Sequence, residues 1–213
     1  MKDIEKIINL NLPDPTSMVM KIAEKIAYTN AVGSKKFIQK MIGPHCIPKR
    51  NGHLYFATMP DKKYIDTSAL YMEPLKTQNG TLYCCKPGMI DAIMCFTAHV
   101  FDRYRDRFSV HTNRTILVHE FFKNFVQISV CIEEKATGKT WIFTEDGLTL
   151  GIIAVHNNVK VILFKTFITL DMLRTNQTEL LGRAVDILHA DSKASLVNTK
   201  LYDKFKAVYE SVS

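Results

Sequence analysis

The spacing of apolar residues changes character several times along the chain. Up to residue 43, apolar residues recur every three or four positions, which is typical of amphipathic helices. Asp14 followed by Pro15 is a helix start signal, because Asp caps a first turn and Pro fits the first helical position. Gly43 and Pro44 end this part. We therefore expect an N-terminal helical segment over residues 1–43.

After a loop expected over residues 44–51, the pattern becomes that of strands. Short apolar runs predict strands over residues 54–57, 68–76, 81–85 and 90–96. Gln78-Asn79-Gly80 is a hairpin signal between the second and third of these strands, because Asn and Gly tolerate positive φ.

Helical spacing returns for two segments in the middle of the chain. Thr97 is placed to cap a helix that ends near Phe108. Thr112 or Asn113 is placed to cap a second helix that runs to about Phe125.

Four apolar strands follow, and they complete the pattern. They are predicted over residues 127–134, 139–144, 148–155 and 159–167. The last strand alternates strictly, with Phe167 on one face and Phe164 and Thr166 on the other. Asn157-Asn158 predicts a type I′ turn before it. A C-terminal helix capped by Thr169 is expected next, interrupted near residues 191–192. The order of these helices and strands along the chain predicts an α+β fold in which helices pack on an antiparallel sheet. We expect an α+β domain over residues 44–213.

The main chemical feature lies in the helix expected after Thr97. His99, Arg103 and Arg107 are spaced four residues apart and fall along one side of that helix. The opposite side is apolar and consists of Val100, Phe101, Tyr104 and Phe108. Histidine transfers protons near neutral pH, and arginine offers planar donors to phosphate. The pattern therefore predicts a phosphate-binding site with a proton-transfer group.

The segment Thr97–Arg107, with its H-x3-R-x3-R spacing, resembles a helix of toxin-like ribonucleases of the barnase, colicin and RelE group. In that group, helices precede an antiparallel sheet. The resemblance implies a metal-independent endoribonuclease or related phosphodiesterase that needs no cofactor. A base would take the ribose 2′-hydroxyl proton, and cationic donors would stabilise the phosphorane. The resemblance implies these catalytic roles for His99, Arg103 and Arg107, with Thr166 as a hydroxyl group on a late strand.

Further cationic residues are candidates for RNA contacts. They are Arg114, His119, Lys123 and Lys165. His111, in the loop after the main helix, is a candidate second proton-transfer group. A formal charge of +7, from 28 Lys and Arg against 21 acids, fits a polyanionic partner. The toxin-like resemblance also implies an inhibitory protein partner and a phage or prophage origin.

Two other functional classes stay open. The chain could be a non-catalytic nucleic-acid-binding module, such as a regulator of a phage or mobile element, in which Arg103 and Arg107 contact phosphate. It could instead be a structural or interaction protein in which these arginines pair with acids. Steep salt dependence of binding would mark the first class, and arginines engaged by carboxylates would mark the second.

Several classes are disfavoured by what the sequence lacks. An odd number of cysteines, five, with an adjacent pair at Cys84-Cys85, argues against a disulfide scaffold and indicates reduced thiols. His45, Cys46 and this pair lack the spacing of a metal site. There is no G-x-S-x-G, Walker A or G-x-G-x-x-G motif. Neither a signal peptide nor a membrane-spanning apolar run is found, so we expect a cytoplasmic protein without membrane contact.

Overall fold

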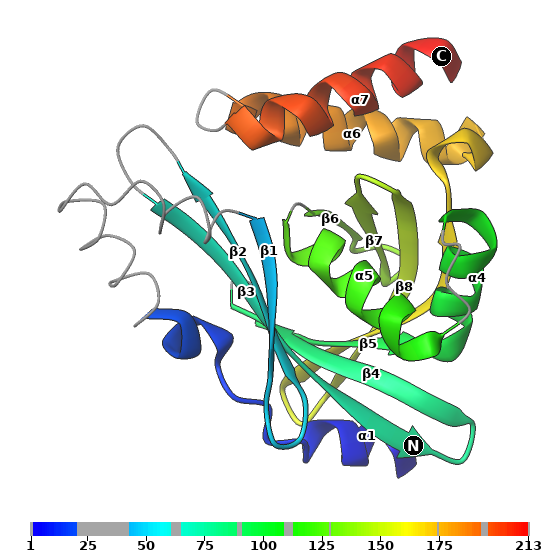
Figure 1. Cartoon of the computed structure of the whole chain (residues 1–213). Coiled ribbons are helices and arrows are strands. Elements are labelled where there is room, and N and C mark those ends of the chain that lie inside the picture. The colour runs from blue at the N-terminus through cyan, green and yellow to red at the C-terminus, as the bar shows by residue number, and fades with distance from the viewer. Residues whose placement is uncertain are drawn as a thin grey trace, which may run out of the picture.

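The computed structural model describes residues 2–20, 43–60, 65–88, 91–108, 113–127, 129–173, 175–192 and 196–212. These residues form one nine-stranded sheet with helices on both faces (Figure 1). The strands are β1 (Gly43–Pro48), β2 (His53–Pro60), β3 (Ile65–Thr77), β4 (Gly80–Pro87), β5 (Ile93–Thr97), β6 (Ser129–Glu134), β7 (Lys139–Thr144), β8 (Gly147–His156) and β9 (Val159–Ile168). The helices are α1 (Lys2–Ile8), α4 (Ala98–Phe108), α5 (Arg114–Gln127), the 3-10 helix η1 (Leu170–Met172), α6 (Thr175–Ser192) and α7 (Leu196–Val212). The predicted α+β class is confirmed.

The sheet consists of two antiparallel meanders joined at the centre. The strand order is β1-β2-β3-β4-β5-β9-β8-β7-β6, and β5 and β9 form its parallel pair. Helices α4 and α5 make the connection between β5 and β6. Strand β5 occupies the middle position of this order, next to β9. Helix α4, which follows β5, therefore begins at the middle of the sheet.

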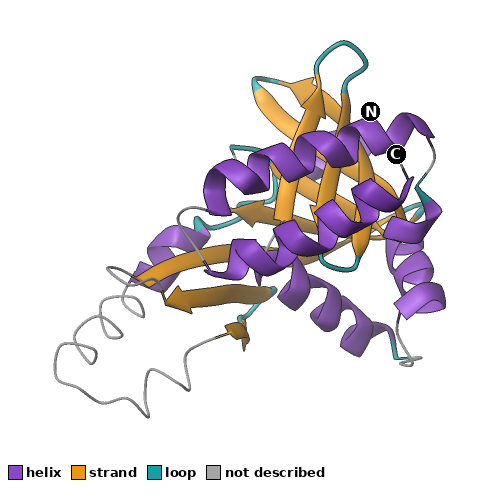
Figure 2. Ribbon diagram, turned by 90° about the horizontal axis from the view of Figure 1, so that it is seen from above, coloured by secondary structure: helices purple, strands orange, loops and turns teal. Residues whose placement is uncertain are grey.

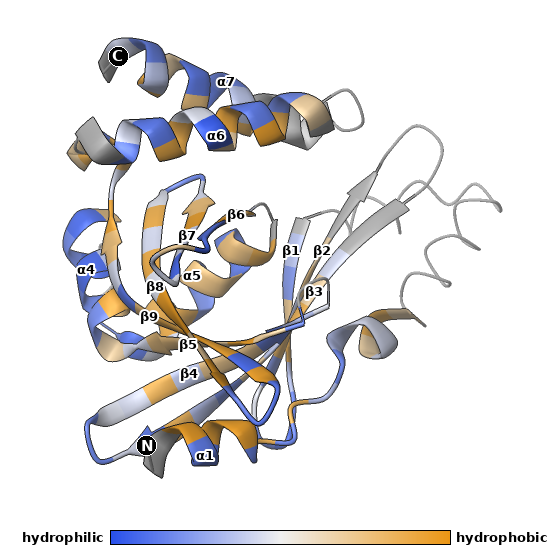
Figure 3. Cartoon of the chain, turned by 180° about the vertical axis from the view of Figure 1, so that it is seen from behind, coloured by the Kyte–Doolittle hydropathy of each residue, from blue (hydrophilic) through white to orange (hydrophobic). Residues whose placement is uncertain are grey.

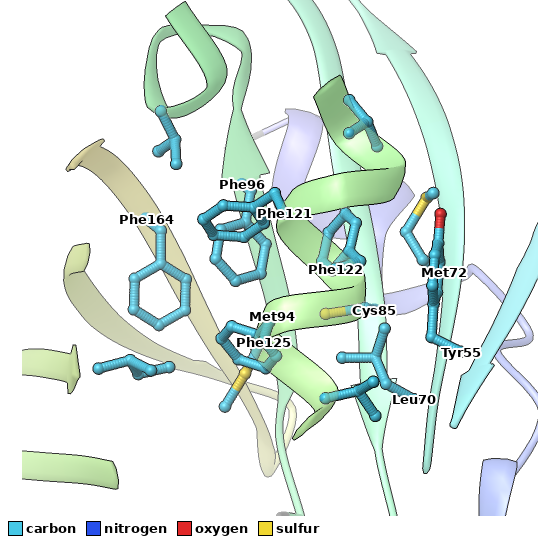
Figure 4. Packing of buried hydrophobic residues seen from close by; sticks show 14 of the residues in the cluster. Tyr55, Leu70, Met72, Cys85, Met94, Phe96, Phe121, Phe122, Phe125 and Phe164 are labelled. Atoms are coloured by element: carbon cyan, nitrogen blue, oxygen red, sulfur yellow. The ribbon is translucent and has the colours of Figure 1, made fainter. Parts of the chain in front are cut away.

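One face of the sheet packs on α4 and α5 through a cluster rich in phenylalanine (Figure 4). Phe96 of β5 stacks on Phe164 of β9 with ring centroids 4.7 Å apart. Phe122 and Phe125 of α5 meet the Phe96 ring edge-on at 5.4 and 5.5 Å. These edge-to-face contacts are favourable beyond the burial of their area, so α5 is held firmly on the sheet.

The other face carries two separate layers. Helices α6 and α7 lie across β6, β7 and β8, where Leu181 and Phe205 pack with Phe143 (Figure 2). Helix α1 and the chain after it cover part of β3, β4, β5 and β9, where Ile7 and Leu12 are buried. Apolar residues are abundant on the central strands of the sheet (Figure 3).

Several local signals in the sequence are confirmed. The Asp14 carboxylate accepts from the amide of Thr16 at 3.0 Å at the start of a helical stretch over residues 15–20. Asn113 caps α5, since its side-chain oxygen accepts from the amide of Thr115 at 2.9 Å. Positive φ angles of 49° and 61° at residues 157 and 158 form the predicted turn before β9.

Other expectations are wrong or fall elsewhere. The loop expected over residues 44–51 contains β1, because this strand lies at the edge of the sheet, where Pro44 and Pro48 are tolerated. Thr169 makes no side-chain capping bond, and a 3-10 turn follows it. Residues 21–42 of the predicted N-terminal helical segment, and with them the remainder of its helices, lie outside the described residues.

Candidate nucleic-acid interface

Helix α4 starts at the centre of the sheet and packs against β9. Strands β5 and β9 pair from Ile93 and Val161 to Phe96 and Phe164, and β9 then continues to Ile168. Helix α4 begins where β5 ends and packs on β9. Its inner side is buried through Val100, Phe101 and Tyr104, and this leaves a polar side at the surface.

The polar side carries the three side chains that the spacing singled out, which we call the α4 ridge: His99, Arg103 and Arg107. His99 and Arg103 are exposed, and Arg107 is half-buried. The Nε–H of Arg103 donates to Nε2 of His99 at 3.4 Å. In this contact Nε2 is the acceptor, which places the proton of a neutral imidazole on Nδ1. A proton acceptor and a permanent cation therefore lie side by side.

The acids of α4 are paired with other arginines. Arg105 lies 3.6 Å from the Asp102 carboxylate and 2.9 Å from that of Asp106. Arg114 of α5 forms a second ion pair with Asp102. Among the residues that the structure describes, no carboxylate lies within 4.0 Å of Arg103. Within that part of the chain, the charge of this arginine is therefore not neutralised by an acid.

Arg107 is held by the backbone of β9. Its guanidinium donates to the carbonyl oxygen of Phe167, beyond the last residue of β9 that pairs with β5. A guanidinium has five N–H donors, so this bond fixes its direction and leaves other donors for a ligand.

Thr166 does not join the α4 ridge. The pairing of β8 with β9 shifts between Leu150, opposite Thr166, and Gly151, opposite Phe164, so that Lys165 is an extra residue in a β-bulge. Phe164 and Phe167 therefore both face α4 and α5. Thr166 shares a face with Leu150, which packs beside α6 and α7. The strict alternation expected for β9 is wrong here, and Lys165 is exposed in the bulge.

Arg114 has a structural position. Its guanidinium donates to the carbonyl oxygen of Ala98 at 3.0 Å and to Asp102. Both partners belong to the first half of α4, so Arg114 ties the start of α5 to that helix. This engagement uses some of the N–H donors of Arg114, and the predicted contact of this residue with RNA stays a prediction.

His119 and Lys123 lie away from the α4 ridge, over β1 and β2. The Tyr55 hydroxyl oxygen lies within hydrogen-bond distance of Nδ1 of His119, at 2.6 Å, and the Cys46 sulfur lies 3.7 Å from the same nitrogen. The ring of His53 meets that of His119 edge-on at 4.6 Å. We call Cys46, His53, Tyr55 and His119 the histidine cluster.

Burial governs the ionisation of the histidine cluster. Burial lowers the pKa of His53. Burial is also the main reason for the lowered pKa of His119, to which the charges of His53 and Lys123 add. Burial raises the pKa of the Cys46 thiol and of the Tyr55 hydroxyl. The cluster is therefore neutral at pH 7 and acts as a polar contact between α5 and the sheet.

A second polar contact positions α4, and sequence reasoning missed it. The Tyr104 hydroxyl donates to the Asp146 carboxylate at 2.8 Å, and the Asn124 amide donates to the same oxygen at 2.8 Å. Burial, and then the charge of Asp146, raise the pKa of Tyr104. The three residues connect α4, α5 and the turn between β7 and β8. Nothing in their sequence spacing indicates that they meet.

Two pockets of the described part of the chain lie away from the α4 ridge. One pocket of about 240 Å³ lies between β3 and the end of α5, and another of about 290 Å³ lies between the chain after α1 and β9. No residue of α4 lines either of them. Within the described ranges, no group of three or more His, Cys, Asp or Glu residues is arranged to hold a metal ion. No helix in those ranges is both long and apolar enough to span a membrane.

The chain was compared with protein families, curated proteins and solved structures, and no match was found in any of the three. The α4 ridge is therefore the feature from which a function can be inferred.

Proposed function

We propose that the protein is a metal-independent endoribonuclease: the α4 ridge binds the phosphodiester backbone of RNA, and His99 transfers a proton during cleavage. One observation carries the proposal. Arg103 is exposed, donates to the imidazole of His99 at 3.4 Å, and has no carboxylate partner within the described residues. A structural role for Arg103 would pair it with an acid, as happens to its neighbour Arg105.

The chemistry follows from the donors and acceptors of the α4 ridge. The terminal nitrogens of Arg103 can bind two phosphate oxygens, and the donors of Arg107 that do not contact Phe167 can bind another. When the Nε–H of Arg103 turns from His99 to the phosphate, His99 Nε2 is freed, and it takes the proton of the ribose 2′-hydroxyl beside that phosphate. The 2′-oxygen bonds to phosphorus and the bond to the 5′-oxygen breaks. The arginines stabilise the added negative charge, the leaving oxygen takes a proton from water, and the resulting hydroxide takes the proton that His99 holds.

The products of this reaction are a 2′,3′-cyclic phosphate and a 5′-hydroxyl. On the basis of the resemblance to toxin-like ribonucleases, the proposal includes a toxin-like role on cytoplasmic RNA and a protein inhibitor as partner. It assigns catalysis to His99, Arg103 and Arg107. It leaves out Thr166, because the β-bulge turns this residue to the other face of the sheet.

The position of Thr166 favours one alternative. Because Thr166 is not beside His99, the same arginines could bind nucleic acid and release it unchanged. This second candidate is a non-catalytic nucleic-acid-binding module. It predicts the same salt dependence of binding but no product.

A direct experiment uses two versions of one labelled RNA, unmodified and fully 2′-O-methylated, incubated with the protein and a metal chelator. The proposal predicts that both are bound and that only the unmodified RNA is cut, with a 2′,3′-cyclic phosphate at the new end. If both are bound and neither is cut, the second candidate is correct. If neither is bound, both functions are wrong.

A further inference from the structure

Two cysteine sulfurs meet between the central strands β4 and β5. Cys84 and Cys95 are directly opposite each other in the antiparallel pair, and the Cys95 thiol donates to the Cys84 sulfur at 3.0 Å. Both residues are fully buried. We propose that Cys84 and Cys95 form a reversible disulfide bond across these strands when the protein meets a disulfide oxidant.

The backbone geometry suits such a bond. Facing residues in an antiparallel pair have Cα atoms about 4.5 or 5.5 Å apart, and disulfides span Cα separations of roughly 4.4 to 6.8 Å. The sulfurs need to approach by only about 1 Å to reach a bond length near 2.05 Å. Small side-chain rotations supply this movement, so the strand register is kept.

The other cysteines do not compete for this pairing. All five lie in the described part of the chain. Cys85 is opposite Met94 and faces α5, on the other side of the sheet from Cys84. Cys46 and Cys131 also border the core on the α5 side. The fold therefore specifies one pair among the five thiols.

The reaction is a thiol–disulfide exchange with a small disulfide such as oxidised glutathione. One cysteine thiolate attacks the oxidant, which gives a mixed disulfide and releases one reduced glutathione. The second cysteine then displaces the other glutathione, so that two protein thiols are oxidised and one glutathione disulfide is reduced. Ile7 and Leu12 cover the pair, and thus exchange requires opening of this layer or refolding of the chain.

The disulfide bond would lie in β5, the strand that leads directly into α4 and its ridge. β5 ends at Thr97 and α4 begins at Ala98, so a cross-link at Cys95 fixes the strand just before the helix. A disulfide stabilises a protein mainly by restricting the unfolded chain. For a loop of this length in a chain of this size, we expect the oxidised protein to melt roughly 5 to 10 °C above the reduced protein.

The test is to refold the full chain in a mixture of reduced and oxidised glutathione, then alkylate it in denaturant and measure its mass and peptide map. We expect the number of alkylated thiols to fall from five to three, with Cys84 and Cys95 in one cross-linked peptide. Reduction should restore all five and lower the melting temperature. Cys131→Ser should keep the cross-link, and Cys95→Ser should lose it.

The peptide map of the wild-type protein decides the matter even if Cys95→Ser fails to fold. A different cysteine pair in the map, or five free thiols in a glutathione mixture rich in the oxidised form, would overturn the proposal. RNA binding plays no part in this result, so it is independent of the proposed nuclease function.

Discussion

The Nε–H of Arg103 donates to Nε2 of His99 at 3.4 Å, one helical turn away on the exposed side of α4. The two acids of the same helix are bound by Arg105 and Arg114 instead. Helix α4 thus separates its paired charges from Arg103, which has no acidic partner among the described residues. This separation provides a matched pair of variants on one helix.

Arg103→Ala should weaken RNA binding about tenfold, which corresponds to roughly 1.4 kcal/mol. The reason is the loss of one phosphate contact, which should also reduce the slope of log K against log salt concentration by nearly 1. Fluorescence anisotropy with a labelled RNA at several salt concentrations measures both quantities.

Arg105→Ala is the control for this prediction. It removes the same charge from the same helix, but its guanidinium is bound by Asp102 and Asp106. We expect a much smaller loss of affinity. Equal losses for the two variants would show that net charge, and not the position of Arg103, controls binding.

Tyr104→Phe should lower the free energy of unfolding by about 1 to 3 kcal/mol. The variant keeps the packed ring but removes the hydroxyl that donates to Asp146 at 2.8 Å. Urea denaturation measures the change. Tyr202→Phe is the control, because its hydroxyl makes no hydrogen bond within the described part of the chain, and it should have little effect.

Gly151→Ala should lower the free energy of unfolding by about 1 to 3 kcal/mol, because a side chain there overpacks the core. A Cβ atom on Gly151 would lie 2.8 Å from two ring carbons of Phe164, beside the bulge of β9. Ala154→Ser, at an exposed position of the same strand, should be nearly neutral in the same thermal or urea melt. A neutral Gly151→Ala would mean that β8 and β9 are less closely packed than described.

The free energy of unfolding should fall as the pH is lowered below about 6.5, the ordinary pKa of histidine. His53 and His119 have lowered pKa values in the folded protein, so the unfolded chain binds more protons over this range. Acid therefore favours the unfolded state through these two groups. Urea melts between pH 7.5 and pH 5 measure the slope.

Replacing both histidines should flatten the pH dependence. The double variant H53Q/H119Q should lose most of the decline below pH 6.5, and His156→Gln, at the end of β8, should retain it. A slope unchanged in the double variant would place the responsible groups elsewhere.

Local signals made much of the fold predictable from the sequence. The turn at Asn157-Asn158 and the cap at Asn113 depend on neighbouring residues alone, and both are found in the structure. Alternation and helical spacing likewise gave the α+β class. Pairing between distant segments has no such local signal, so the sequence does not predict the parallel pairing of β5 with β9.

The candidate site was predictable only in part for the same reason. The spacing of His99, Arg103 and Arg107 places them on one side of a helix whatever lies around it. The side of the sheet taken by Thr166 depends on one extra residue in β9, which no periodicity in the sequence reveals. The ion pair of Arg114 with Asp102 depends on how two helices meet.

The central claim is that His99 transfers a proton during RNA cleavage, and single-turnover cleavage of a labelled RNA in the presence of a chelator tests it most directly. We predict that His99→Ala lowers the cleavage rate by about 10² to 10⁴ while RNA affinity changes little, and that Arg105→Ala cleaves at nearly the wild-type rate. Cleavage by His99→Ala at the wild-type rate would contradict the claim.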